Sequence, residues 1–196
     1  MDLSIVLVSY RHRVALAACL DSLPAACAGL QYEVIFVDNA PDDGLIEDVR
    51  VHRPTIRTIA NQTNEGFARG VNKGLAVAQG RNLALFNPDT IAYPGAFTAL
   101  VRYADAHPEV GLVGPKVTDP DGAIQYSCRR FPTLAAGLFN RYSLLTKMFP
   151  RNRWSVSYMM MDFDHGSTVD VDWLTGACIV ARRDAVEKVG PLDPAF

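Results

Sequence analysis

The sequence has no long hydrophobic run. No stretch approaches the roughly 18 consecutive apolar residues of a transmembrane helix, and the opening run, residues 3–8, is too short for the core of a signal peptide. Cysteine is also scarce: the four cysteines form no C-x-x-C pair and show no metal-ligand spacing. Cys19 and Cys178 stand in apolar runs, so we expect buried thiols and a reducing, cytoplasmic location.

The chain also lacks an excess of charge of one sign. Its 19 basic and 21 acidic residues give a net charge of −2, which argues against a polybasic surface that binds nucleic acid and leaves a local anion site open. No G-x-G-x-x-G, no P-loop and no G-x-S-x-G is present, which disfavours a dinucleotide cofactor, a P-loop nucleotidase and an α/β-hydrolase. With 49% apolar residues, the chain can still bury a sizeable core.

The first 115 residues alternate between apolar runs typical of buried strands and stripes typical of helices. We expect strands at 3–8, 33–37, 56–60, 82–86 and 110–113, and helices at 13–23, 43–49, 67–80 and 95–106. This alternation predicts an α/β fold with a mostly parallel, Rossmann-like sheet.

The pattern changes after residue 115. We expect a hairpin turn at 118–122, an irregular stretch at 126–165, strands at 169–174 and 177–180, and a helix at 183–189. No linker is evident, so we predict a single domain, 1–196, in which the pattern changes between 1–115 and 116–196.

Polar residues directly follow the first four predicted strands. Because ligands bind beyond the carboxyl ends of parallel strands, these residues are expected to share one site. The candidates for nucleotide binding are Ser9, Tyr10, Arg11, Asp38, Asn39, Asn64, Gly66, Asn72 and Asn87.

Each candidate also has an ordinary structural use. The Asp38 carboxylate can accept from the imide N–H of uracil or thymine, or it can form an Asx-turn. Tyr10 can lie against the base or ribose, or simply pack. Gly66 allows close backbone approach ahead of a helix N-terminus that favours an anion. Asn72 either reaches the same pocket or lies exposed on the helix, and Lys73 is expected at the solvated surface.

The segment Asn87-Pro-Asp89 is the sharpest local feature. Asp89 could hold Mg²⁺ or Mn²⁺, an ion that usually shares few protein ligands with phosphates. Asn87 could position that ion through water or bind a sugar hydroxyl. The alternative is a turn in which Asp89 caps the next helix.

Five segments in order resemble the inverting family 2 glycosyltransferases of the GT-A fold, in particular the rhamnosyltransferase-like branch that builds bacterial surface polysaccharides: 4–10, 34–39, 64–72, 85–89 and 171–177. The resemblance implies a UDP- or dTDP-sugar donor, dTDP-rhamnose among them, and a saccharide or lipid-linked acceptor. It makes Asp38 the base-reading acid and Asp89 the last acid of a D-x-D motif whose first acid is replaced by Asn87. Trp173, Gly176 and Ala177 match the sugar and acceptor side. The resemblance thus implies a nucleotide-binding part, 1–115, and an acceptor-side part, 116–196, that is incomplete at its C-terminus.

The resemblance also implies that the catalytic base belongs to a Glu-Asp pair that follows a G-x-[FL]-D stretch. Residues 190–196 supply the start of that stretch, so the base is expected beyond Phe196 and the chain is predicted to be truncated. Two hypotheses follow. The first is a glycosyltransferase donor domain whose activity needs missing or partner-supplied residues. The second is a nucleotide-sugar-binding module, or a truncated product, without transferase activity. A nucleotidyltransferase would need a Gly-rich loop after the first strand, and residues 9–13 contain no glycine.

Apolar and arginine side chains mix within 126–165. They suit peripheral contact with a lipid-linked acceptor at the inner face of the plasma membrane, and the alternatives are an acceptor loop or the contact of a homodimer. The apolar members are Phe131, Leu134, Leu138, Leu144, Leu145, Met148 and Phe149.

Overall fold

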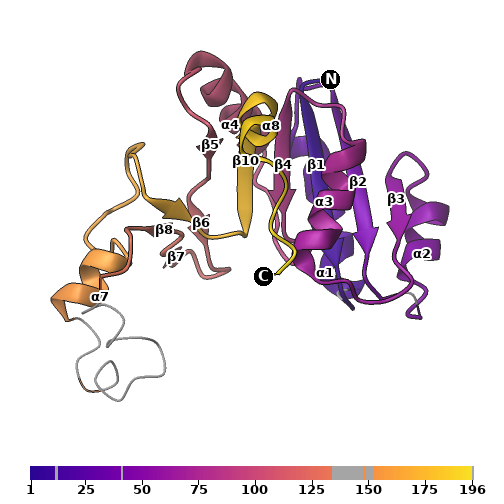
Figure 1. Cartoon of the computed structure of the whole chain (residues 1–196), viewed down its shortest axis with the longest axis horizontal. Coiled ribbons are helices and arrows are strands. Elements are labelled where there is room, and N and C mark those ends of the chain that lie inside the picture. The colour runs from indigo at the N-terminus through magenta and orange to yellow at the C-terminus, as the bar shows by residue number, and fades with distance from the viewer. Residues whose placement is uncertain (12, 41, 134–147, 149–151, 196) are drawn as a thin grey trace. The chain divides into compact units, whose positions relative to one another are not determined.

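The computed structural model describes residues 1–11, 13–40, 42–133, 148 and 152–195 (Figure 1). The chain divides into two compact units. The first unit joins residues 1–115 to residues 176–196, and the second holds residues 116–175. Residues 176–196 therefore fold with the first unit, although the sequence grouped them with 116–175.

The first unit is built on a six-stranded sheet in the order β3-β2-β1-β4-β10-β5. The strands β1 to β4 are mutually parallel, and β10 runs antiparallel to both β4 and β5. This confirms the predicted mostly parallel sheet. Strand β10 comes from the end of the chain, which is why residues 176–196 belong to this unit. The bounds are β1 Leu3–Ser9, β2 Tyr32–Asp38, β3 Arg57–Ala60, β4 Asn82–Phe86, β5 Leu112–Val113 and β10 Cys178–Arg182.

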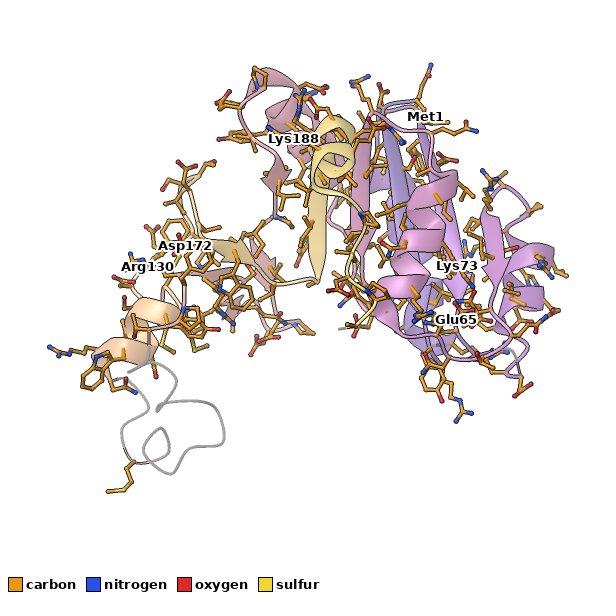
Figure 2. All side chains as sticks on the ribbon, viewed as in Figure 1. Met1, Glu65, Lys73, Arg130, Asp172 and Lys188 are labelled. Atoms are coloured by element: carbon orange, nitrogen blue, oxygen red, sulfur yellow. The ribbon has the colours of Figure 1, made fainter. Side chains whose placement is uncertain are left out.

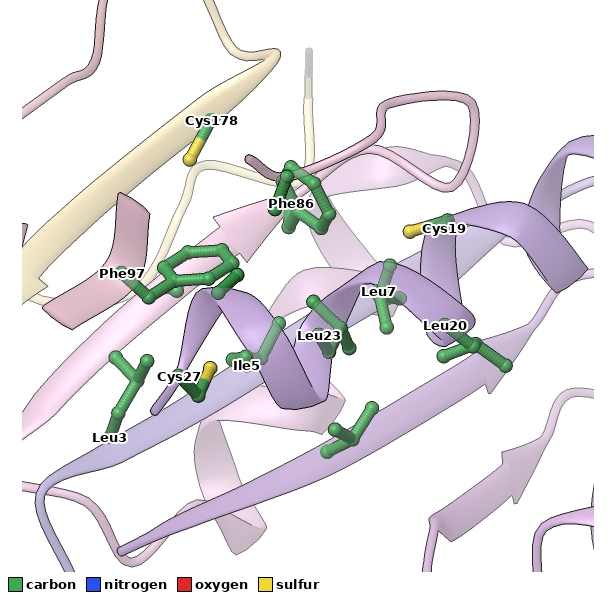
Figure 3. Packing of buried hydrophobic residues seen from close by; sticks show 14 of the residues in the cluster. Leu3, Ile5, Leu7, Cys19, Leu20, Leu23, Cys27, Phe86, Phe97 and Cys178 are labelled. Carbon is green, nitrogen blue, oxygen red and sulfur yellow. The ribbon is translucent and has the colours of Figure 1, made fainter. Parts of the chain in front are cut away.

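Helices cover both faces of this sheet, as Figure 1 shows. The larger core cluster joins alternate residues of β1, Leu3, Ile5 and Leu7, to residues of α1 and α4 (Figure 3). On the opposite face, Val6 of β1 clusters with residues of β2, and Leu75 of α3 packs against them. The period of two along a strand sends neighbouring side chains to opposite faces. The helices are α1 Arg13–Ala26, α2 Leu45–His52, α3 Phe67–Val77, α4 Ala96–Ala106 and α8 Arg183–Val189.

The buried cysteines belong to the larger cluster. Cys19 and Cys178 are buried, as expected, and Cys27 is buried as well. Burial raises the pKa of each of these thiols to about 12. They are therefore packing residues, since the reactive form of cysteine is the thiolate.

Two glycines of α3 allow the helix to lie close against β1. A Cβ atom added to Gly70 would stand 2.7 Å from a methyl group of Val8, and one added to Gly74 would come closer still to Val6. Both approaches are too short for ordinary packing. Residues one turn apart on α3 therefore fix the height of this helix along β1, and with it the position of the helix N-terminus at the carboxyl end of the strand.

The second unit contains two small antiparallel pairs. Strand β6, Val117–Thr118, pairs with β7, Ile124–Gln125, around a turn closed by a hydrogen bond from the Gly122 amide to the Asp119 carbonyl, 2.9 Å. The predicted hairpin turn is thus present. Strand β8, Cys128–Arg129, pairs with β9, Trp173–Leu174, and helix α7 spans Arg153–Tyr158. The strand expected at 169–174 is reduced to its last two residues.

The proposed membrane-contact stretch is only partly described. Phe131 and Met148 are exposed, as such a surface requires. No helix within the described ranges is long and apolar enough to cross a membrane. The other apolar members lie outside the described residues: Leu134, Leu138, Leu144, Leu145 and Phe149.

Candidate functional site

A cavity of about 320 Å³ opens at the carboxyl edge of the large sheet. The segments that follow β1, β2, β3 and β4 all contribute to it, as the parallel topology predicts. The cavity brings together seven of the nucleotide- and metal-site candidates, whereas Arg11, Asp38 and Asn72 do not line it. Its lining residues are Val8, Ser9, Tyr10, Asn39, Asn64, Gly66, Phe67, Asn87, Pro88 and Asp89.

Two buried side-chain oxygen atoms without a partner lie at the ends of β1 and β2. Ser9, which lines it, and Asp38 are paired in register at the ends of the neighbouring strands β1 and β2, and both are at most 1% exposed. The Ser9 hydroxyl and Asp38 Oδ2 have no hydrogen-bond partner among the described residues. Buried polar atoms normally have partners, so these two are free to meet a ligand.

The Asp38 carboxyl group forms the predicted Asx-turn with one oxygen and leaves the other oxygen without a partner. Its Oδ1 accepts from the Ala40 amide, 2.9 Å away, which is the Asx-turn. Its Oδ2 stays unpartnered within the described chain. Burial raises the pKa of Asp38, and the negative charges of Asp43 and Glu47 act in the same direction. A donor that reaches Oδ2 would relieve the cost of ionising this buried carboxyl.

A chain of amide hydrogen bonds supports one wall of the cavity. Asn39 donates to the Gly66 carbonyl, 3.1 Å, and accepts from Asn61, 2.6 Å. The Asn61 side-chain oxygen accepts in turn from Lys73, 2.6 Å, and Lys73 also forms an ion pair with Glu65, 2.6 Å (Figure 2). Lys73 was expected at the solvated surface; its side chain is 41% exposed and makes these two contacts as well. This series of hydrogen bonds holds the loop between β3 and α3 in one position.

This loop leads directly into helix α3. Asn64 accepts from the Gly66 amide, 3.0 Å, and Gly66 has a φ of +86°, which favours glycine. No side chain caps α3 in the described structure. Its first amides are therefore open to an anion at the cavity rim.

Two aromatic rings flank the cavity. Tyr10 is 45% exposed, and the Arg11 guanidinium carbon lies 5.2 Å from its ring centroid. Phe67 is 49% exposed, although the helical pattern had assigned it to the buried stripe of α3. As the first residue of the helix it extends beyond the sheet edge, where it can contact a flat ring.

Asp89 presents an open carboxylate on the other side of the cavity. It is exposed and has no hydrogen bond or ion pair within the described ranges. It does not cap the next helix, because Gly95 occupies the N-cap of α4. No group of three or more potential metal-ligating His, Cys, Asp or Glu side chains exists among the described residues. A single open carboxylate fits Mg²⁺ or Mn²⁺ shared with phosphate oxygens and does not fit a site built from protein ligands alone.

The remaining candidates are divided between the two units. The main-chain N–H of Asn87 donates to the Ala177 carbonyl, 3.0 Å. Gly176 and Ala177 therefore belong to the first unit and lie next to the end of β4. Asn72 instead holds the C-terminal segment, through hydrogen bonds to the carbonyl and amide of Leu192, 2.8 and 2.9 Å. Trp173 lies in the second unit and is 38% exposed.

Comparison with known proteins gives consistent matches. The family model described as glycosyl transferase family 2 matches residues 4–190. An N-acetylglucosaminyl-diphospho-decaprenol L-rhamnosyltransferase of Mycobacterium tuberculosis is 30% identical over 207 residues, which cover 99% of this chain and 66% of that protein. An uncharacterized glycosyltransferase of Haemophilus influenzae is 25% identical over 57% of this chain and 37% of its own length. The chain thus spans less than two thirds of either relative.

Solved structures give the same picture for the fold. A mannosyltransferase, PcManGT from Pyrobaculum calidifontis in complex with GDP-Man and Mn²⁺, superposes with a TM-score of 0.62 at 17% identity, over 98% of this chain and 47% of that one. S. aureus TarS 1–349 in complex with UDP-GlcNAc superposes with a TM-score of 0.55 at 18% identity, over 71% of this chain and 42% of that one.

Proposed function

Because the chain belongs to glycosyl transferase family 2 and has the GT-A fold, we propose that it transfers a sugar from a nucleotide-sugar donor to a saccharide acceptor with inversion. The proposed donor is a UDP- or dTDP-linked sugar, with dTDP-rhamnose as the first choice. The proposed acceptor is a lipid-linked saccharide, since the M. tuberculosis relative is named for rhamnosyl transfer to a decaprenol diphosphate-linked sugar.

The observation that carries this proposal is the pair of unpartnered oxygens of Ser9 and Asp38. A uracil or thymine ring offers an imide N–H that can donate to the Asp38 carboxylate and a carbonyl that can accept from the Ser9 hydroxyl. Tyr10 and Phe67 supply apolar contact for the flat ring. We therefore place the pyrimidine at the ends of β1 and β2.

The diphosphate of the donor would then lie between Asp89 and the N-terminus of α3. The open amides of α3 favour an anion there, and Asp89 would hold Mg²⁺ or Mn²⁺ against the phosphate oxygens. When bound, such an ion neutralises the charge of the leaving diphosphate. The chain's own groups bind and orient the donor, and positioning supplies much of the rate acceleration in transfer between two bound substrates.

Thermal unfolding with nucleotides tests the donor site. At a hundredfold excess of ligand over its dissociation constant, binding adds about 2.7 kcal/mol, which raises the Tm of a chain of this size by roughly 5–10 °C. We expect this shift for UDP or dTDP with Mn²⁺, and its loss in Asp89→Ala. Glu109→Ala, which removes an exposed carboxylate that has no ion pair within the described chain, is the matched control. Equal shifts with ADP or GDP would contradict the role given to Asp38.

The second hypothesis, a nucleotide-sugar-binding module without transferase activity, predicts the same thermal shifts. Product formation separates the two. Release of UDP or dTDP from a donor sugar in the presence of a lipid-linked acceptor supports transfer. Binding without transfer or slow donor hydrolysis supports the module.

A further inference from the structure

Two aromatic side chains of the second unit flank the positive charge of Arg129. Arg129 of β8 lies directly opposite Trp173 of β9 in the strand register. Its guanidinium carbon is 5.8 Å from the Trp173 ring centroid and 6.0 Å from that of Tyr158, at the end of α7. The two rings are 6.1 Å apart and inclined at 46°. Strand pairing and a helix end thus bring a guanidinium and two aromatic faces together.

No carboxylate balances this charge. Arg129 has no ion pair in the described structure, and the undescribed residues contain no aspartate or glutamate that could supply one. Its described hydrogen bonds go to the main-chain carbonyls of Tyr126 and Cys128. Burial lowers its pKa. In the first unit, by contrast, Arg81 and Arg182 both pair with aspartates. A partly buried cation without a counter-charge is costly and favours an anionic ligand.

A buried hydroxyl lies next to this charge in the chain. Ser127 is 5% exposed, and its hydroxyl has no partner among the residues that the structure describes. It precedes Arg129 by two positions, and its carbonyl accepts from the Thr175 amide, 3.0 Å, next to the β8–β9 pair. Both groups donate hydrogen bonds, so together they suit the oxygen atoms of a phosphate.

The Trp173 ring is held in place but not covered. Its indole N–H donates to the Arg130 carbonyl, 3.2 Å away, while 38% of the residue stays exposed. Aromatic faces of this kind pack against the apolar faces of sugar rings. The combination of an unbalanced guanidinium, an unpartnered hydroxyl and an open indole therefore matches a phosphorylated sugar better than a phosphate alone.

On the premise of the proposed function, we infer that Arg129, Ser127, Trp173 and Tyr158 bind the sugar 1-phosphate or diphosphate group of the acceptor. The guanidinium and the hydroxyl would bind phosphate oxygens, because the planar fork of arginine matches them. The aromatic rings would contact the attached sugar.

Tryptophan fluorescence tests this inference in the full chain. The sequence has two tryptophans, so Trp154→Phe leaves Trp173 as the single reporter. In this background we expect N-acetylglucosamine 1-phosphate to give a saturable change in Trp173 emission. Glycerol 3-phosphate, inorganic phosphate and N-acetylglucosamine should each bind at least about tenfold more weakly, since each lacks one half of the recognised group.

Substitutions of Arg129 distinguish recognition by the planar guanidinium group from attraction by its positive charge alone. Arg129→Gln and Arg129→Lys should both weaken binding of the sugar phosphate by about tenfold or more. Arg130→Gln is the matched control, because Arg130 is the exposed neighbour with no ion pair in the described chain, and it should change affinity less than about twofold. Arg129→Lys keeps the charge, so an unchanged near-ultraviolet circular dichroism spectrum would show that weaker binding is not misfolding.

Three results would overturn the inference: no saturable emission change, equal binding of glycerol 3-phosphate, or equal loss of affinity in Arg130→Gln. The nucleotide thermal shift reports on the other unit. If nucleotides stabilise the protein while the sugar phosphate does not bind, this inference fails and the proposed function stands. If neither binds, the proposed function fails as well.

Discussion

The role of the Asn72 side chain in holding the segment 191–195 can be tested by substitution. Its two hydrogen bonds to Leu192 join residues 120 positions apart. Residue 72 lies two positions from both Gly70 and Gly74, about 200° around the helix, so it points away from the β1 face. The hydrogen bonds described for residues 191–195 are this pair and a local one from the Ala195 amide to Asp193. Asn72→Ala should therefore release the segment from α3.

The size of the effect follows from the two bonds. Each contributes about 0.5–1.5 kcal/mol, so about 1–3 kcal/mol is lost from the attached state of the segment. Since every 1.4 kcal/mol is a factor of ten in an equilibrium constant, opening should become roughly 5- to 150-fold more frequent. This is local opening of the exposed segment 191–195, so the Tm of the sheet should change little.

Hydrogen exchange measured on the peptides that cover residues 186–195 reports this opening. Leu192 should exchange faster in Asn72→Ala by the factor above. Arg69→Ala, at an exposed position of the same helix with no ion pair among the described residues, should leave the exchange of Leu192 unchanged. Asn72→Asp keeps an acceptor for the Leu192 amide but loses the donor to its carbonyl, so it should lie between the two. An unchanged exchange rate of Leu192 in Asn72→Ala would refute the reasoning. If nucleotide binding were weakened as well, Asn72 would again be a candidate for the donor-binding site.

Two further predictions concern packing and burial in the first unit. Gly74→Ala should lower the free energy of unfolding by about 1–3 kcal/mol in chemical denaturation, since the new methyl group meets Val6; Gly176→Ala, which meets nothing within 4 Å, is the control, and equal losses would contradict the close packing. A raised folded-state pKa of Asp38 means that stability falls as pH rises through that pKa. Asp38→Asn should therefore raise the Tm near pH 7–8, flatten its pH dependence and weaken binding of uridine nucleotides; a lower Tm with a retained pH slope would be the contrary result.

The apolar runs of the sequence were sufficient to predict the main sheet. Continuous runs such as residues 3–8 are typical of strands covered on both faces, and they became β1, β2 and β4. Parallel topology then places the ends of these strands at one edge of the sheet. Ser9, Asn39 and Asn87 could therefore be assigned to one site from the sequence alone, and all three line the cavity.

The remaining features depend on contacts between distant parts of the chain. Local pattern could not reveal that β10 enters the sheet between β4 and β5. It could not show that Lys73 bonds Asn61, because the helix residue and the loop residue meet only after α3 has docked on the sheet. Phe67 fitted the helical stripe but stands at its first position, where the sheet no longer covers it. In each of these cases, contacts with residues far away in the sequence decide where the residue or strand lies, and residue type alone does not.

The position of β10 has a consequence for how the protein is made. Strand β5 is two residues long, and β10 is the neighbour that joins it to the sheet. Until the ribosome has released residues 178–182, β4 is an edge strand with unpaired main-chain groups, and β5 has no strand to join. Such edges invite pairing with other chains. The first unit, although nearly complete in sequence by residue 115, thus depends on a strand synthesised more than 60 residues later. Expression fragments that stop before this strand should aggregate.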